Sequence, residues 1–150
     1  GNFAYTGGMD GHLKRLNIYT REVLIDFGQI HHGKGITTFC CDFRNKSGFT
    51  AGEDYELVSV DLEDRFLEHR YGKVGSKWIT SLDVSKCGRY VYTVDMDGHL
   101  MEFDTSKRER GKDYGKIGVT LWRVRLSTDG KYLFTGQHSG KITQWEISDC

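Results

Sequence analysis

Two stretches of the chain have nearly the same sequence: YTGGMDGHLKRL (Tyr5–Leu16) and YTVDMDGHLMEF (Tyr92–Phe103). Seven of their twelve positions are identical, and they begin 87 residues apart. Self-similarity at a fixed interval indicates a repeat architecture, in which stacked copies of one small unit bury a shared core. If the true period is half this spacing, another copy should lie between the two stretches.

Further copies occur between these stretches and after them. Aromatic–Thr pairs recur at intervals of 44, 43 and 42 residues, as Tyr5-Thr6, Phe49-Thr50, Tyr92-Thr93 and Phe134-Thr135. In the same register, the fourth residue after each Thr is Asp10, Asp54, Asp97 or Ser139. A second marker, aromatic–Gly–Lys/Gln–Ile/Val, keeps the period in Phe27–Ile30, Tyr71–Val74 and Tyr114–Ile117. The chain therefore contains four copies of one unit.

Each unit has the pattern of four short strands. In the third copy, Leu82 and Val84 alternate with polar residues, and YVYTV is rich in the aromatic and β-branched residues that favour strands. HLMEFD and the polar segment TSKRERGKDYG follow as two more strands. Asp-Gly pairs favour tight hairpins, so turns are predicted at Asp10-Gly11, Asp54-Tyr55, Asp97-Gly98 and Ser139-Gly140. No helix longer than about two turns is expected in residues 36–104.

Four-stranded antiparallel sheets of this kind bury both faces only by stacking on their neighbours, and radial stacking gives a β-propeller. The predicted fold is therefore all-β, with propeller blades covering 1–34 (partial), 35–77, 78–118 and 119–150 (partial). The chain supplies about fourteen strands, or three and a half blades.

These features resemble the WD-repeat β-propeller family. The resemblance rests on the period, the aromatic–Thr strand, the Asp-Gly hairpin and the turns Ser85–Gly88 and Ser127–Gly130. The Trp-Asp pair that names the family corresponds here to Leu16-Asn17, Val60-Asp61, Phe103-Asp104 and Trp145-Glu146, and the Gly-His pair before the first strand is replaced by the second marker. The family's ring usually has seven blades, which implies that this chain is about half a ring.

The resemblance also implies a buried network of His, Asp, Ser/Thr and Trp side chains, which is only partly present here. Its Thr and Asp members correspond to Thr6, Thr50 and Thr93 with Asp10, Asp54 and Asp97. In the fourth unit, Thr135 and Trp145 are present, but Ser139 stands in place of Asp.

Charge and composition argue against several classes of partner. The chain has 21 basic and 21 acidic residues and no net charge, whereas nucleic-acid and anionic-membrane surfaces need a basic excess. Neither a nucleic acid nor a membrane is therefore expected as a partner. The four cysteines, Cys40, Cys41, Cys87 and Cys150, are expected to be free thiols, as in a reducing compartment. The expected location is intracellular and cytoplasmic, with association with the cytoskeleton as an option.

No motif indicates catalysis, a cofactor or a metal. His31-His32 and Cys40-Cys41 lack the spacing of a zinc site, and loop histidines and core thiols are the preferred interpretation. The basic run KRERGK, residues 107–112, is interpreted as a solvated outer strand, with a phosphate-binding patch as the alternative.

The predicted function is a non-catalytic protein-interaction scaffold of the WD-repeat type. Two alternatives remain: a structural half-propeller completed by self-association, and a propeller enzyme with a site in the central channel. The missing blades would come from the rest of a longer chain, a partner or a second copy.

The resemblance places the binding site for a protein or peptide on one face, at the residue before the Asp of each tight turn and at the start of each innermost strand. The predicted contact residues are Met9, Glu53, Met96, His138, Trp78 and Trp122. Met adapts to irregular partners and Trp is a frequent hot-spot anchor. An equally weighted alternative is that both tryptophans are core residues wedged between blades.

Overall fold

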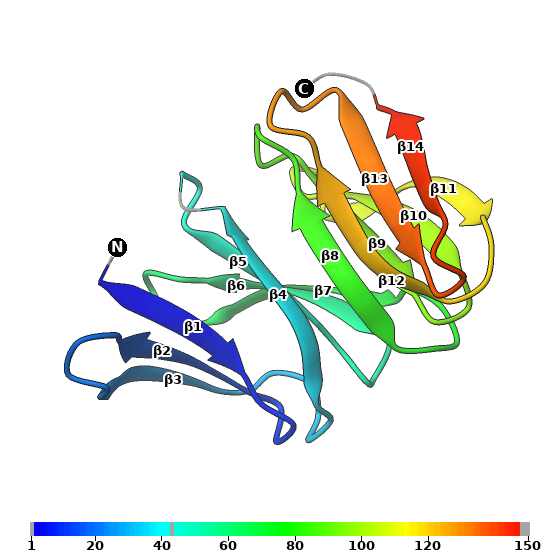
Figure 1. Ribbon diagram of the computed structural model, residues 1–150. Coiled ribbons are helices and arrows are strands. Elements are labelled where there is room, and N and C mark those ends of the chain that lie inside the picture. Colours follow the sequence, from blue (N-terminus) through cyan, green and yellow to red (C-terminus); the bar gives the residue numbers. More distant parts are fainter. Residues whose placement is uncertain (1, 43, 148–150) are drawn as a thin grey trace.

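The computed structural model describes residues 2–42 and 44–147, and over these residues the chain forms fourteen strands and no helix (Figure 1). The first sheet contains β1 (Phe3–Gly7), β2 (His12–Asn17) and β3 (Val23–Gln29). The second contains β4 (Ile36–Asp42), β5 (Ser47–Gly52), β6 (Glu56–Asp61) and β7 (Leu67–Lys73). The third contains β8 (Ile79–Val84), β9 (Tyr90–Asp95), β10 (His99–Asp104) and β11 (Glu109–Lys116). The fourth contains β12 (Leu121–Leu126), β13 (Tyr132–Gln137) and β14 (Ile142–Glu146). The all-β prediction is confirmed.

The four sheets, numbered here as blades 1 to 4, follow one another around an open arc (Figure 1). Strand β1 contacts β4, β4 contacts β8, and β8 contacts β12, so the same edge of each sheet lines the inside of the arc. Among the described residues, blade 1 has no counterpart of the inner strands β4, β8 and β12, and blade 4 has no counterpart of the outer strands β3, β7 and β11. The arrangement is part of a β-propeller.

The burial of each strand follows from its place in this stack. Strands β5, β6 and β9 are buried on both faces because a neighbouring sheet covers each side. Buried on both sides, they have continuous apolar runs such as the LVSV of β6 rather than strict alternation. Strand β14 alternates between exposed and half-buried residues because one face of blade 4 has no sheet against it.

The threonines of the repeat occupy equivalent places, as predicted. Thr6, Thr50, Thr93 and Thr135 lie in β1, β5, β9 and β13 and pair across the hairpin with Lys14, Val58, Met101 and Thr143. The last three threonines are completely buried against the preceding blade. Thr6 is exposed because none of the described residues forms a sheet against this side of blade 1.

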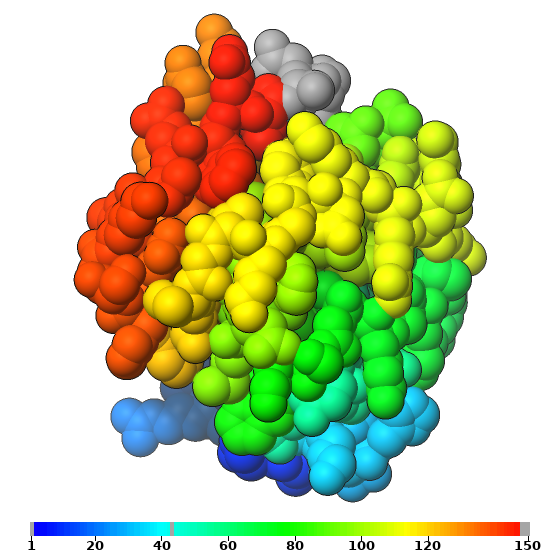
Figure 2. All heavy atoms as spheres, turned by 90° about the vertical axis from the view of Figure 1, so that its right-hand side faces the viewer, coloured from blue at the N-terminus to red at the C-terminus, as the bar shows by residue number. Residues whose placement is uncertain are grey.

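The core is divided into one apolar cluster at each junction between blades. Leu13 and Val58 lie in the first, Leu57 and Phe103 in the second, and Leu100 and Val124 in the third. Figure 2 shows the outer side of the third junction, where β14 lies against β11. There the rings of Tyr114 and Trp145 meet edge to face, with centroids 6.0 Å apart.

Candidate functional site: a Met–Trp surface

Four turns with the same geometry lie on one face of the arc. In the first, the Gly8 carbonyl accepts the Gly11 N–H at 3.1 Å, and Met9 and Asp10 form the corner between them. The same bond occurs after β5, β9 and β13, between Gly52 and Tyr55, Asp95 and Gly98, and Gln137 and Gly140. Each turn is thus centred one residue earlier than the predicted Asp-Gly pairs, and only its last residue has a positive φ. The sequence placed the turns correctly to within one residue.

This shift puts the predicted contact residues at the first corner of each turn. Met9, Glu53, Met96 and His138 all take this position, where a side chain projects from the end of the blade. Met9 is 72% exposed, and a Cβ at Gly35 would lie 2.9 Å from its sulfur. Gly35 therefore provides the space in which the Met9 side chain rests.

The two tryptophans stand beside these turns. Trp78 immediately precedes β8 and is 44% exposed; Trp122 is the second residue of β12 and is 43% exposed. The indole N–H of Trp122 donates to Nδ1 of His138 at 3.1 Å. Neither side chain is a buried wedge between blades. Both present more than two fifths of their area to solvent.

Met9, Trp78, Met96 and Trp122 line one pocket of about 390 Å³. This pocket and its rim are called the Met–Trp surface below. The pocket is also lined by Ile36, Thr37, Ile79, Thr80 and Arg123. The hydroxyls of Thr37 and Thr80 donate to the carbonyls of Ile79 and Leu121, joining neighbouring inner strands. These hydroxyls are engaged in structural bonds, so the pocket offers apolar contact area with one cation at its rim.

Glu53 and His138 lie at the margins of this surface. Glu53 lines an adjoining pocket together with Trp78, and its carboxylate accepts the Gly35 N–H at 3.3 Å. His138 reaches the surface through its bond to Trp122. The fold therefore places all six predicted residues on one face, four of them around a single pocket.

A buried network supports this face at the junction of blades 1 and 2. His31 is completely buried; its Nδ1 lies 2.8 Å from a carboxylate oxygen of Asp54 and its Nε2 lies 2.9 Å from the Thr50 hydroxyl. A neutral ring that donates from Nδ1 and accepts at Nε2 satisfies both contacts. Burial raises the pKa of Asp54, but the bonds from His31 and the Glu56 N–H outweigh burial and hold it below its ordinary value. His31 lies in the β3–β4 loop, as interpreted from the sequence, but it is completely buried there.

In blade 3, a different side chain occupies the space that His31 fills beside blade 2. Gly75 stands where blade 2 has His31, and Asp95 stands where blade 2 has Gly52. Asp95 is buried, and its Oδ1 accepts the N–H groups of Asp97 and His99, both at 2.9 Å. A Cβ at Gly75 would lie 2.7 Å from the other oxygen, Oδ2, which has no hydrogen-bond partner among the described residues. In each of these two blades, one side chain occupies this space: His31 does so beside Gly52, and Asp95 does so beside Gly75.

One group of side chains has the composition of a metal site but is already committed to other bonds. His32, Asp54 and Glu56 offer ligand atoms within 4.8 Å of one another. The Asp54 carboxylate is bonded to His31, and Glu56 pairs with Arg70 at 2.9 Å. A metal there would have to displace both contacts.

The cysteines differ from one another. Cys40 and Cys41 are free thiols, as predicted, and burial raises the pKa of both. Cys87 is disulfide-bonded, so the prediction of a free thiol is wrong at this position. Cys150 lies outside the described residues.

Two similarities to known proteins accord with this geometry. Residues 66–104 match the WD40 family, described as "WD domain, G-beta repeat". The chain is 24% identical over 123 residues to the WD repeat-containing protein SL1-17 of Schistosoma mansoni, an alignment covering 77% of this chain and 40% of the relative. The chain thus spans about two fifths of that relative's length. The described residues include no helix long and apolar enough to span a bilayer.

Proposed function

We propose that this chain is a WD-repeat protein and that it is a non-catalytic scaffold that binds a protein or peptide partner on the Met–Trp surface. WD repeats generally mediate protein–protein interaction. The observation that carries the proposal is the pocket in which two exposed tryptophans and two methionines converge. Large aromatic anchors and adaptable thioethers around a concave apolar site are typical of binding hot spots. The absence of net charge supports a protein rather than a nucleic-acid or membrane partner.

The test compares what the protein captures with and without the anchor. Wild-type and Trp78→Ala proteins are immobilised, and proteins retained from cell extract are identified by mass spectrometry. Because Trp78 is partly exposed, the substitution should leave the melting temperature nearly unchanged. Partners that use the Met–Trp surface should be lost, and a purified partner should bind at least about 30-fold more weakly, as for a hot-spot residue.

Tyr19→Ala is the matched control, because Tyr19 is an exposed aromatic in the β2–β3 turn, away from this surface. Met96→Ala tests a second lining residue. The proposal fails if the Trp78→Ala and Met96→Ala proteins remain folded and retain every partner that the wild type binds.

We also propose that the free flank of blade 4 is covered by a further blade. Ile142 is 73% exposed there, whereas its equivalents Leu57 and Leu100 are completely buried by the following blade. The covering sheet would come from the rest of a longer chain, a partner or a second copy. Association with a second copy would make the protein a structural half-ring as well as a binding module.

The free thiols of Cys40 and Cys41 support an intracellular, cytoplasmic location, and the disulfide at Cys87 argues against it. Fractionation of cells that express the protein would show whether it is in the cytoplasm or outside it.

A further inference from the structure

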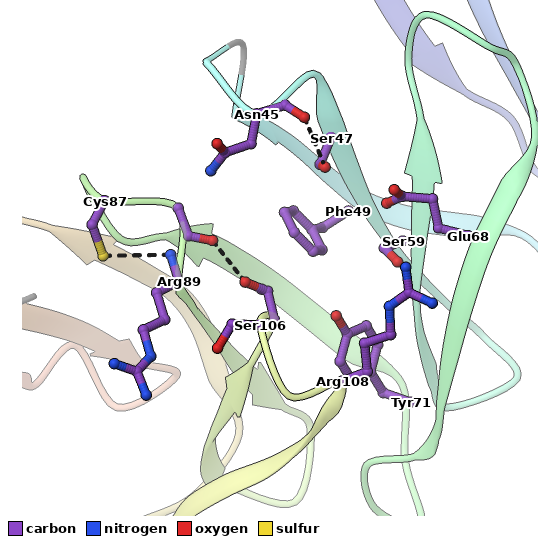
Figure 3. A pocket seen from close by; sticks show the side chains of 12 residues that line it. Asn45, Ser47, Phe49, Ser59, Glu68, Tyr71, Cys87, Arg89, Ser106 and Arg108 are labelled. Atoms are coloured by element: carbon purple, nitrogen blue, oxygen red, sulfur yellow. Dashed lines mark hydrogen bonds between the residues drawn. The ribbon is translucent and has the colours of Figure 1, made fainter.

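A second cavity, of about 330 Å³, lies at the junction of blades 2 and 3 (Figure 3). It is lined by residues of the β4–β5, β8–β9 and β10–β11 turns, among them Asn45, Arg89 and Ser106. The Met–Trp surface is built from the turns at the other ends of these antiparallel strands. The cavity therefore opens on the opposite face, where an occupant would not compete with one bound at the Met–Trp surface.

The cavity has a polar lining over a partly apolar floor. Ser59, Tyr71 and Phe49 are buried residues that line it, and Ser59 and Tyr71 each bring a hydroxyl. Hydroxyls of Ser47, Thr105 and Ser106 line it further. This chemistry suits a polar or charged group rather than an apolar side chain.

In blade 3, the position equivalent to Ser59 is occupied by a carboxylate. By strand register, Ser59 of β6 corresponds to Glu102 of β10, and Tyr71 corresponds to Tyr114. In blade 3 the Glu102 carboxylate accepts the Tyr114 hydroxyl at 3.5 Å and the Lys112 N–H at 3.4 Å. Burial and the nearby Glu102 carboxylate raise the pKa of Tyr114 to about 12. In blade 2 a serine replaces the glutamate, so this position offers Tyr71 a hydroxyl instead of a carboxylate; the nearest carboxylate that lines the cavity is that of Glu68, on the neighbouring strand.

Two arginines, Arg89 and Arg108, line the cavity, and Arg89 already forms an ion pair with Asp104. Arg89 donates from Nε and one terminal nitrogen to Asp104 at 3.2 and 3.1 Å. These bonds and those from Ser106 and Lys107 outweigh burial and lower the pKa of Asp104 to about 2. Arg108 forms no ion pair with any described residue, and Figure 3 shows it beside Tyr71 and Ser59. A cation therefore stands next to the place that a carboxylate fills in the next blade.

We propose that this cavity binds the carboxylate of an Asp or Glu side chain from an acidic segment of a partner protein. Arg108 and Tyr71 hold this carboxylate in the place that Glu102 takes one blade further on. Charge-assisted bonds from a guanidinium to a carboxylate are among the strongest polar contacts between proteins. Glu68 also lines the cavity and opposes the incoming charge, so it limits the affinity.

The test titrates the folded chain with a capped hexaglutamate peptide and, separately, with a capped hexaglutamine peptide, at low ionic strength. Binding is followed by NMR chemical shifts. Hexaglutamate should bind and shift residues around the cavity, whereas hexaglutamine should not. Because Arg108 is exposed, Arg108→Gln should fold normally and weaken hexaglutamate binding at least about tenfold, the loss expected for one charge-assisted contact.

Three variants define the site further. Ser59→Glu supplies the carboxylate from the chain itself, as Glu102 does, and should abolish peptide binding while the protein stays folded. Glu68→Gln removes the opposing charge and should strengthen binding. Arg65→Gln should have no effect, because Arg65 has the same positive-φ place in the preceding blade but does not line the cavity.

The proposal is overturned if hexaglutamate and hexaglutamine bind alike, or if Arg108→Gln binds hexaglutamate as tightly as the wild type. If Ser59→Glu does not fold, the Arg108→Gln result decides. Inorganic phosphate is titrated in parallel. If it binds more tightly than hexaglutamate with the same dependence on Arg108, the site is for phosphate and the carboxylate assignment is wrong. Trp78→Ala should leave hexaglutamate binding unchanged, which separates this site from the Met–Trp surface.

Discussion

At the scale of single residues, His31 joins the first two blades through polar contacts. It follows β3 of blade 1, yet both of its ring nitrogens bond to side chains of blade 2, Thr50 and Asp54. A polar ring is stable in this completely buried position because both of its nitrogens are satisfied. The junction therefore depends on a histidine at a position where blades 3 and 4 have Gly75 and Gly118.

Replacing His31 with alanine should lower the free energy of unfolding by about 1–3 kcal/mol, because the Thr50 hydroxyl and the Asp54 carboxylate lose a buried partner. Urea unfolding measures this change. His32→Ala is the matched control, since His32 is 66% exposed and should be nearly neutral. Equal effects of the two substitutions would contradict the assigned network.

The same network predicts a pH dependence. The pKa of Asp54 is lower in the folded protein than its ordinary value, so its stabilising contribution is complete at neutral pH. That contribution is lost as the pH falls below about 4 and through the folded pKa. His31→Ala should reduce the loss of stability over this acid range, because the lowering of the Asp54 pKa depends on His31.

Sequence patterns predicted the repeated Thr and Asp residues but not His31. The threonines and aspartates recur at a fixed interval, so their register could be counted. His31 has no histidine at the matching position of later copies, and its importance appears only when β3 and β5 are brought together. Its position directly after the marker Phe27–Ile30 was the one signal that pointed to it.

At the scale of the blade, one buried space is filled by a side chain from either of two positions. One position follows the outermost strand of the preceding blade, and the other lies at the end of the blade's own second strand. In blade 2 it holds His31, and a Cβ at Gly52 would lie 2.9 Å from the His31 ring. In blade 3 it holds Asp95 opposite Gly75, and in blade 4 a Cβ at Gly118 would lie 2.7 Å from the Gln137 side chain. The two positions are therefore mutually exclusive, and the residues at them are coupled.

This coupling predicts the outcome of a double-mutant cycle. Gly75→His alone should be destabilising because the new ring meets the Asp95 carboxylate. Combined with Asp95→Gly, it should place a histidine near Thr93 and Asp97, as in blade 2, and recover stability. The expected coupling energy is about 1–3 kcal/mol, within the range for residues in contact. Urea unfolding of the wild type, the two single variants and the double variant measures this energy. If the effects of the two substitutions simply add, the two positions do not compete for one space.

The strands themselves were predictable, whereas the register of the turns was not. Strand patterns such as LWRVRLS and YLFTG place β12 and β13 because apolar residues recur with the period of a strand. The turns were assigned to Asp-Gly pairs, but Asp10 and Asp97 lie at the second corner, and the glycine that follows each has the positive φ. Both geometries are compatible with the same dipeptide. The six predicted contact residues share a face, but whether a partner binds there stays a prediction.

At the scale of the whole molecule, the two ends of the arc differ in chemistry. On blade 4, Phe134 and Ile142 are 36% and 73% exposed on the flank that a following blade would cover. On blade 1, the flank that would face a preceding blade carries Lys14 and His12, each paired with Asp26. The apolar end is therefore the one that drives association.

Ile142→Lys should reduce association of the chain. A charged side chain on this flank would have to be desolvated on contact, which is unfavourable. The measurement is molar mass by size-exclusion chromatography with light scattering over a range of concentrations. Val119→Lys is the control, because Val119 is an exposed apolar residue that precedes β12 and lies outside the flank strands. A wild-type chain that stays monomeric and stable at every concentration would contradict this prediction.

The hydroxyl bonds between inner strands also indicate which part of the molecule we expect to open first. Thr37 joins blade 2 to blade 3, and Thr80 joins blade 3 to blade 4. Within the part of the chain that the structure describes, blade 1 has no inner strand and takes part in no such bond. Each blade contacts only its neighbours, as in other stacked repeats, so local unfolding need not involve the whole chain. Blade 1 is held to blade 2 by the His31 contacts and by the apolar cluster of Leu13 and Val58. We therefore expect blade 1 to separate from the stack before blades 2 to 4 unfold.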